Sequence, residues 1–155
     1  MKTMKPLCSV LLLLASSAMA DVKLSNIFAD DMVLQRDVNA TVYGTAADGE
    51  TVTATIDGKS ASATAKDGQF LIKLPEHKAG GPYTLTVKGK TTVTLKNVLY
   101  GDIWLAGGQS NMAFKLLSIQ RQVQHKERLA ELAKNTDVRV LLMPIKASNK
   151  VEADI

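Results

Sequence analysis

The chain has 155 residues, of which 46% are hydrophobic and 22% charged, a composition typical of a globular protein with a packed core. Residues 1–20 hold two lysines and no acid, so the formal charge of +4 becomes 17 basic against 15 acidic residues, or +2, without them. So small a charge gives no argument for nucleic acid binding. Aromatic residues make up only 5% of the chain, which also excludes the stacking platforms of single-strand binders.

Residues 1–20 have the features of a secretory signal peptide. Two lysines precede an apolar run from Leu7 to Ala15, and Ala18-Met19-Ala20 is a small-x-small cleavage site. The run is shorter than the roughly 20 residues that cross a bilayer. Cys8, the only cysteine, lies in this segment, so no disulfide, thiolate ligand or thiol nucleophile is expected after cleavage. We therefore expect cleavage after Ala20, export to the periplasm or the medium, and no membrane contact afterwards.

Residues 21–98 consist of short alternating runs separated by turn residues, the pattern of half-buried antiparallel strands. The segment 51–56 alternates threonine with valine, alanine and isoleucine, and the Asp57-Gly58 pair after it favours a tight hairpin turn. Roughly seven such strands with regular turn signals predict a β-sandwich of Ig-like or jelly-roll type.

Three more turn signals follow within this region. We expect a second hairpin at Asp67-Gly68, a break in the chain at Gly80-Gly81-Pro82, and a turn at Gly89 that leads into a strand from Thr92. The apolar residues between these turns recur at period two: Phe70, Ile72, Leu74, Tyr83, Leu85 and Val87.

The pattern changes at Tyr100. Residues 101–106 predict a compact apolar strand, residues 119–134 a helix with one apolar side, and residues 138–143 a second buried strand. Strand, helix and strand make one βαβ unit. A parallel pair cannot cover both of its faces, so we expect residues 99–155 to be the beginning of an α/β domain that is incomplete in this chain.

Ser110 follows the first of these strands, in the run Gly108-Gln109-Ser110-Asn111-Met112. A serine at a strand-to-helix turn is commonly a helix cap. It is also well placed for chemistry, because ligands collect at the carboxyl ends of strands and N–H groups at a helix start stabilise negative charge. The Gly-x-Ser-x-Gly elbow of α/β-hydrolases is not matched, since Met112 stands in place of the second glycine.

Four short sequence motifs, through their order and spacing, bear on whether Ser110 is a helix cap or a catalytic residue. They are LSNIF with DMVLQR (24–28 and 31–36), AGGPYTL (79–85), NVLYGDIWL (97–105) and GQSNM (108–112). Together they resemble the sialate O-acetylesterase family of SGNH-type hydrolases over nearly all of the mature chain. The resemblance implies a β-sandwich ahead of an SGNH-hydrolase domain, an O-acetylated carbohydrate substrate, and no cofactor.

The resemblance also implies roles for individual residues. Ser110 would be the nucleophile, its N–H would help to bind the oxyanion, and Gln109 and Asn111 would support the site. A glycine, an asparagine and an Asp-x-x-His pair from later parts of the family domain are not found here, so we expect this chain to be a fragment that is inactive alone. Ala113-Phe114 stands where relatives usually have an acidic residue and tryptophan, which leaves the substrate open.

Neither histidine is expected to activate Ser110. His125 lies 15 positions after it, and a helix that rises about 1.5 Å per residue would separate them by roughly 20 Å. His77 is interpreted as a solvated residue of the polar loop 75–78. Asp102 is interpreted as a structural hydrogen-bonding residue. No acids or histidines show the spacing of a metal site.

Two other functions remain open at this stage. A non-catalytic carbohydrate-binding or interaction module would need exposed aromatic side chains, for which the sandwich offers Phe28, Tyr43, Phe70 and Tyr83. An acetylxylan-type or other polysaccharide esterase would use the same nucleophile. The oligomeric state is not indicated by the sequence.

Overall fold

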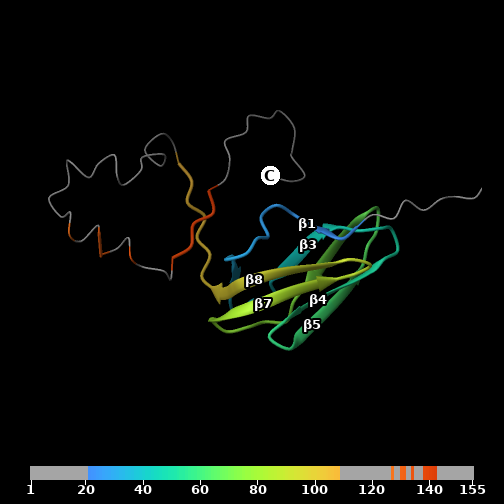
Figure 1. Ribbon diagram of the computed structural model, residues 1–155, viewed down its shortest axis with the longest axis horizontal. Helices are drawn as coiled ribbons and strands as arrows, with labels where there is room; N and C mark the ends of the chain where they lie inside the picture. Colours follow the sequence, from blue (N-terminus) through green and yellow to red (C-terminus); the bar gives the residue numbers. More distant parts are fainter. Residues whose placement is uncertain (1–20, 109–126, 128–129, 132–133, 135–137, 143–155) are drawn as a thin grey trace, which may run out of the picture.

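The computed structural model describes residues 21–108, 127, 130–131, 134 and 138–142. Within them, eight strands form two sheets (Figure 1). The strands are β1 (Lys23–Leu24), β2 (Val33–Gln35), β3 (Thr41–Thr45), β4 (Thr51–Ile56), β5 (Lys59–Thr64), β6 (Gln69–Lys73), β7 (Gly80–Lys88) and β8 (Thr92–Gly101). One sheet has the order β1-β3-β6 and the other β2-β8-β7-β4-β5. The prediction of a strand-rich region is confirmed, and its Ig-like or jelly-roll type stays a prediction.

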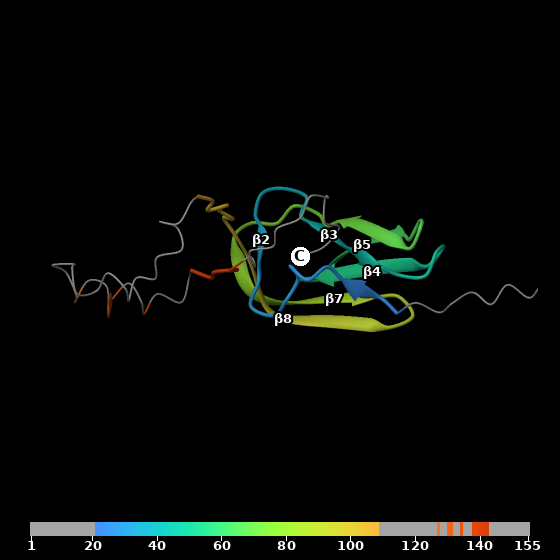
Figure 2. The same ribbon diagram turned by 90° about the horizontal axis from the view of Figure 1, so that it is seen from above.

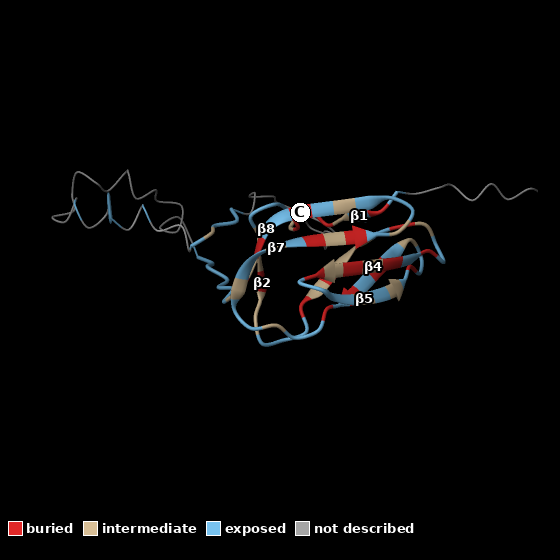
Figure 3. Cartoon of the chain, turned by 60° about the horizontal axis from the view of Figure 1, so that its bottom comes forward, coloured by how far each residue is buried: buried red, intermediate tan, exposed pale blue. Residues whose placement is uncertain are grey.

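Strand β4 shows why this sequence forms a half-buried sheet. Its apolar side chains Val52, Ala54 and Ile56 are buried, while its threonines alternate toward the other face (Figure 3). The turn after β4 uses Asp57 and Gly58 at φ angles of 47° and 69°, the positive values that a two-residue hairpin requires. The predicted β4–β5 hairpin is therefore confirmed, with Ile56 paired to Lys59.

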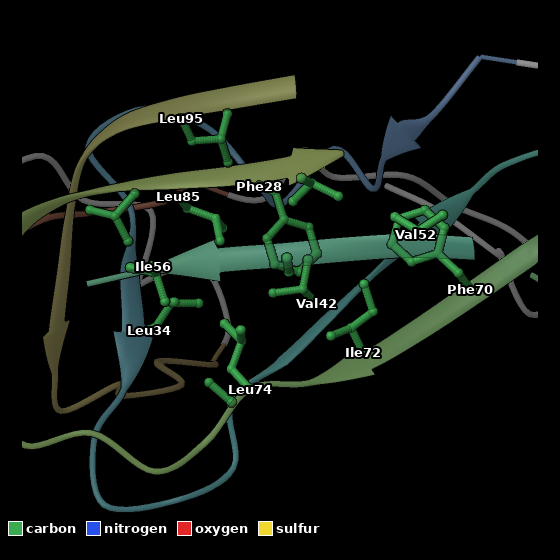
Figure 4. Packing of buried hydrophobic residues seen from close by; sticks show 14 of the residues in the cluster. Phe28, Leu34, Val42, Val52, Ile56, Phe70, Ile72, Leu74, Leu85 and Leu95 are labelled. Carbon is green, nitrogen blue, oxygen red and sulfur yellow. The ribbon is translucent and has the colours of Figure 1, made fainter. Parts of the chain in front are cut away.

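Buried side chains from both sheets form one hydrophobic cluster. Figure 2 shows β3 of the smaller sheet on the opposite side of the unit from β7 and β8 of the larger one. Val42 and Ile72 come from the three-stranded sheet, and Ile56 and Leu85 come from the five-stranded sheet (Figure 4). Fully burying each such side chain is worth about 1.5–3 kcal/mol relative to exposure. The cluster therefore holds the two sheets together without a cross-link.

The second predicted hairpin is wrong. Asp67 and Gly68 do turn the chain, with φ angles of 54° and 76°, but a single bridge between Lys66 and Gln69 is all that joins the two sides. Beyond the turn, β6 pairs with β3 in the other sheet. The local dihedral angles set the turn, whereas the burial of Phe70 and Ile72 in the shared cluster sets the partner strand.

The predicted break at Gly80-Gly81-Pro82 is also wrong, because β7 begins at Gly80 and runs through it. The pairing with β8 shifts register between Gly80 and Tyr83. Gly81 has a φ of 124°, and a Cβ there would lie 2.9 Å from the Val98 carbonyl oxygen. The glycine therefore permits close approach of β8 where another residue would separate the strands.

Strand β8 runs on to Gly101, and its Tyr100 belongs to the hydrophobic cluster. Strand β2 lies beside it at the edge of the five-stranded sheet, and the pair is parallel, with Val33 opposite Leu99 and Gln35 opposite Gly101. The sequence pattern did not predict this pairing. The pairing of β2 with β8 ends at Gly101, and from there the chain leaves the two sheets toward Ser110.

Candidate active site

Ser110, Gln109 and Asn111 lie outside the described residues, and the structure follows the chain as far as Gly108. The strand predicted for residues 101–106 is wrong, since β8 ends at Gly101 and residues 102–108 form no strand. Trp104 is 87% exposed and Leu105 97% exposed. A strand must pair its backbone groups and cover its apolar faces, and the described part of the chain supplies neither.

The prediction of the second strand of the βαβ unit is also wrong. Residues 138–142 form no strand, and Val140 and Leu142 are 84% and 87% exposed. Of the helix predicted for residues 119–134, the structure describes Glu127, Ala130 and Glu131 as helical and Lys134 as part of a turn. The other positions, His125 among them, lie outside the described residues. The described residues thus contain neither strand of the predicted βαβ unit, and the unit as a whole stays a prediction.

The interpretation of His77 as a solvated loop residue is wrong. Its side chain is only 11% exposed, and its ring stacks on Tyr100 with centroids 4.4 Å apart. One ring nitrogen faces the Lys78 carbonyl oxygen at 2.7 Å and the other faces Asp57 Oδ2 at 2.9 Å. Burial of Tyr100 raises the pKa of its hydroxyl. His77 is thus engaged within the two-sheet unit and is not a free base for a distant serine.

Asp102 directly follows β8 and is held by Arg36 at the end of β2. Arg36 Nε donates to Asp102 Oδ1 at 3.0 Å and Nη2 donates to Oδ2 at 3.3 Å, a two-point contact that raises the pKa of the guanidinium. The Ile103 N–H donates to Gln35 Oε1 at 2.9 Å. These contacts confirm Asp102 as a structural hydrogen-bonding residue. We call Gln35, Arg36, Asp102 and Ile103 the Arg36 clasp.

The ion pairs extend from the clasp to a neighbouring loop. Arg36 Nη1 donates to Asp37 Oδ2 at 2.6 Å, and Lys78 Nζ donates to Asp37 Oδ1 at 2.7 Å. The hydrogen bond from Lys78 is the largest cause that lowers the pKa of Asp37 below its ordinary value of 3.8. The Asp37 N–H also donates to the His77 carbonyl oxygen at 2.8 Å, which joins the two loops through their backbones.

The lowered pKa predicts how the Lys78–Asp37 pair depends on pH. A carboxyl whose folded-state pKa is depressed stabilises the fold above its unfolded pKa, and this stabilisation is lost as pH falls through the folded pKa. We expect Lys78→Ala to lower the thermal midpoint only slightly near neutral pH, because the pair is exposed, and to lower it less at a pH of about 2, where more of the Asp37 carboxyl is protonated. Thermal melts of both proteins across this range test the prediction, which an equal difference at both ends would contradict.

Arg139 is a contact residue that the sequence pattern did not single out. Its guanidinium donates to the Met32 carbonyl oxygen at 3.1 Å, to the Asn97 carbonyl oxygen, and to Asn97 Oδ1 at 3.1 Å. Asn97 has a φ of 55°, and its amide donates to Asp31 Oδ1 at 2.5 Å. A lone arginine in an apolar run was the available signal, because a partly buried guanidinium needs acceptors. We call Arg139, Met32 and Asn97 the Arg139 anchor.

The described residues contain neither a metal cluster nor a membrane-spanning helix. No group of three or more histidine, cysteine, aspartate or glutamate side chains there could hold a metal ion. No helix in that part of the chain has the length and apolarity needed to cross a membrane.

Sequence comparison finds sialate O-acetylesterases. The human protein is 33% identical over 137 aligned residues, which cover 79% of this chain and 26% of the human protein. The protein from Rattus norvegicus is 30% identical, and the aligned residues cover 25% of its length. No protein-family model matches the chain. The chain thus spans about a quarter of the length of the curated relatives that it matches.

Structural comparison finds an enzyme of similar description. The crystal structure of a carbohydrate acetylesterase from Xanthomonas citri matches with a TM-score of 0.66 and 37% sequence identity, covering 74% of this chain and 26% of that one. The fold and the sequence therefore both match proteins named as acetylesterases. By these matches the chain is similar to sialate O-acetylesterases over about four-fifths of its own length.

Proposed function

We propose that this chain carries the nucleophile of an exported serine esterase that removes O-acetyl groups from sialic acid or related sugars. The observation that carries the proposal is the agreement of two kinds of relative, both named as acetylesterases, with the GQSNM run at 108–112. In the proposed architecture the two sheets are a β-sandwich, an SGNH-hydrolase domain begins after strand β8 rather than at residue 99, and residues 1–20 are a signal peptide.

The proposed reaction needs no cofactor. Ser110 Oγ attacks the acetyl carbonyl carbon, and the negative charge on the carbonyl oxygen is bound partly by the Ser110 N–H. The sugar oxygen leaves and takes up a proton, which leaves an acetyl group on Ser110. Water then attacks this ester, releasing acetate and restoring the serine hydroxyl.

The base that removes the Ser110 proton is not proposed from this chain. His77 is engaged with Asp57 and Tyr100 in the two-sheet unit, and the Asp-x-x-His pair that the family resemblance implies is not found in the sequence. An unactivated serine hydroxyl is a weak nucleophile. We therefore propose that the chain alone lacks esterase activity and needs a histidine from further sequence.

A graft supplies the missing groups and tests the function. In this protein, which we call the graft, residues 21–155 replace the segment of the Xanthomonas citri enzyme that they match. That segment makes up 26% of the Xanthomonas citri enzyme. We expect the graft to release acetate from O-acetylated sugars, and residues 21–155 alone to release none above the uncatalysed rate. A folded graft that releases no acetate from any O-acetylated sialoside or xylan oligosaccharide would contradict the proposal.

No observation favours the alternative of a carbohydrate-binding module. Phe28 and Phe70 are buried in the hydrophobic cluster, and Tyr43 and Tyr83 pack against it. Sugar-binding faces need exposed aromatic rings, and among the described residues only Trp104, beyond the last strand, is an exposed large aromatic. Glycan binding that survives deletion of residues 102–155, which leaves strand β8 whole, would nevertheless restore this alternative.

A further inference from the structure

Two groups of contacts tie the sequence on either side of Ser110 to strand β2. The Arg36 clasp binds residues 102–103 at the C-terminal end of β2. The Arg139 anchor binds Met32, which immediately precedes β2, at the other end. Figure 1 shows the segments 102–108 and 138–142 at the same end of the two-sheet unit. Both flanks of the stretch that contains Ser110 therefore contact one short edge strand and its neighbours.

Strand β2 is a firm support for these contacts. Its central residue Leu34 is 4% exposed and belongs to the hydrophobic cluster. Its parallel pairing with β8 is extended at both ends, by the Leu99 N–H donating to the Met32 carbonyl oxygen at 3.0 Å and by the Arg36 N–H donating to the Gly101 carbonyl oxygen at 3.0 Å. The clasp and the anchor are thus attached to core-supported backbone rather than to a free loop.

The two groups of contacts differ in chemistry. The clasp joins opposite charges, with exposed fractions of 40% for the Arg36 side chain and 52% for that of Asp102. The anchor places a cation against uncharged carbonyl oxygens of Met32 and Asn97. The planar fork of arginine suits both, because it donates several parallel hydrogen bonds in a fixed geometry.

We propose that Arg36 and Arg139 are positioning residues for the reaction: they fix where the chain leaves and rejoins the two-sheet unit and so orient the stretch that carries Ser110. This inference rests on the proposed function, since it assumes that Ser110 is the nucleophile. Neither arginine is required to touch substrate. Displacing a catalytic group by about 1 Å can slow a reaction roughly a hundredfold, so remote supports of this kind affect turnover.

Trp104 reports on the clasp without any catalysis. It is the only tryptophan in the sequence, it is 87% exposed, and it lies two residues after Asp102. In purified residues 21–155, we expect Arg36→Ala to lower the fluorescence anisotropy of Trp104 and to speed hydrogen exchange of the Ile103 N–H roughly fivefold. The charge swap of Arg36→Asp with Asp102→Arg should recover at least half of both changes.

Lys78→Ala is the matched control, because it breaks the adjacent exposed ion pair with Asp37 and leaves the clasp intact. Its Trp104 anisotropy should equal that of the unaltered chain. Unchanged anisotropy in Arg36→Ala, or an equal fall in Lys78→Ala, would overturn the inference. If Arg36→Ala does not fold, Asp102→Asn gives the same readout from the other side of the contact.

The graft then separates positioning from general structure. We expect Arg36→Ala and Arg139→Ala each to lower kcat for acetate release roughly tenfold or more, with KM within about twofold, and Arg139→Lys to recover part of the loss. Unchanged kcat together with lowered Trp104 anisotropy would overturn the positioning role. If the unaltered graft releases no acetate, the proposed function fails, and the Trp104 comparison still decides whether the clasp orders residues 102–104.

Discussion

Replacing Ser110 with alanine in the graft is expected to lower the rate of acetate release by roughly a thousandfold or more. Alanine has no hydroxyl, so no acetyl-enzyme can form, and only oxyanion stabilisation and binding would remain. Substrate binding should change little, because the nucleophile contributes mainly to the transition state. The measurement is kcat and KM with an aryl acetate and with an O-acetylated sugar.

Ser118→Ala is the control for this loss, since it removes the same hydroxyl from another position in the same stretch of sequence. Its activity should equal that of the unaltered graft. Loss of activity in both variants would indicate a folding defect rather than a missing nucleophile. Full activity of Ser110→Ala would show that Ser110 is not the nucleophile.

Gly44→Ala is expected to lower the free energy of unfolding of residues 21–155 by about 3 kcal/mol. Gly44 lies on β3 opposite Leu24 of β1, and a Cβ there would be 2.0 Å from the Lys23 carbonyl oxygen and 2.9 Å from the Leu24 Cα. These are backbone atoms and cannot rotate aside, so the two strands must separate. Separation also weakens the burial of Val22, which is 3% exposed in the hydrophobic cluster.

Gly49→Ala is the matched control, because a Cβ at Gly49 meets no atom within 4 Å. Its φ of 75° still disfavours alanine, so we expect a loss of only about 1 kcal/mol. Denaturant unfolding followed by circular dichroism measures both variants. Equal losses at the two positions would contradict the close contact between β1 and β3.

Local sequence signals predicted local structure well. The alternation in β4 and the Asp57-Gly58 turn were predicted because side-chain period and turn dihedral angles depend on neighbouring residues. The pairing of β2 with β8, and the crossing from β5 to β6 between sheets, were not predicted. Those features depend on which distant residues share a buried cluster, and the single sequence gives no direct signal for that.

The same distinction applies to the candidate site. Ser110 is predicted from the GQSNM run, a short local motif, and stays a prediction. His77 was misinterpreted because its loop is polar, whereas its ring is covered by Tyr100, more than twenty positions along the chain. The apolar runs 101–106 and 138–143 have strand composition, but composition does not supply the partners that a buried strand needs. The Arg36 clasp joins residues 66 positions apart and required the structure.

The most direct test of the central claim is acetate release by the graft and by its Ser110→Ala version, measured side by side on an O-acetylated sialoside. The proposed function predicts release by the graft, a loss of roughly a thousandfold or more in the variant, and an acetyl group trapped on the Ser110 peptide during turnover. Equal rates in the two proteins, or an acetyl group found on another residue, would contradict it.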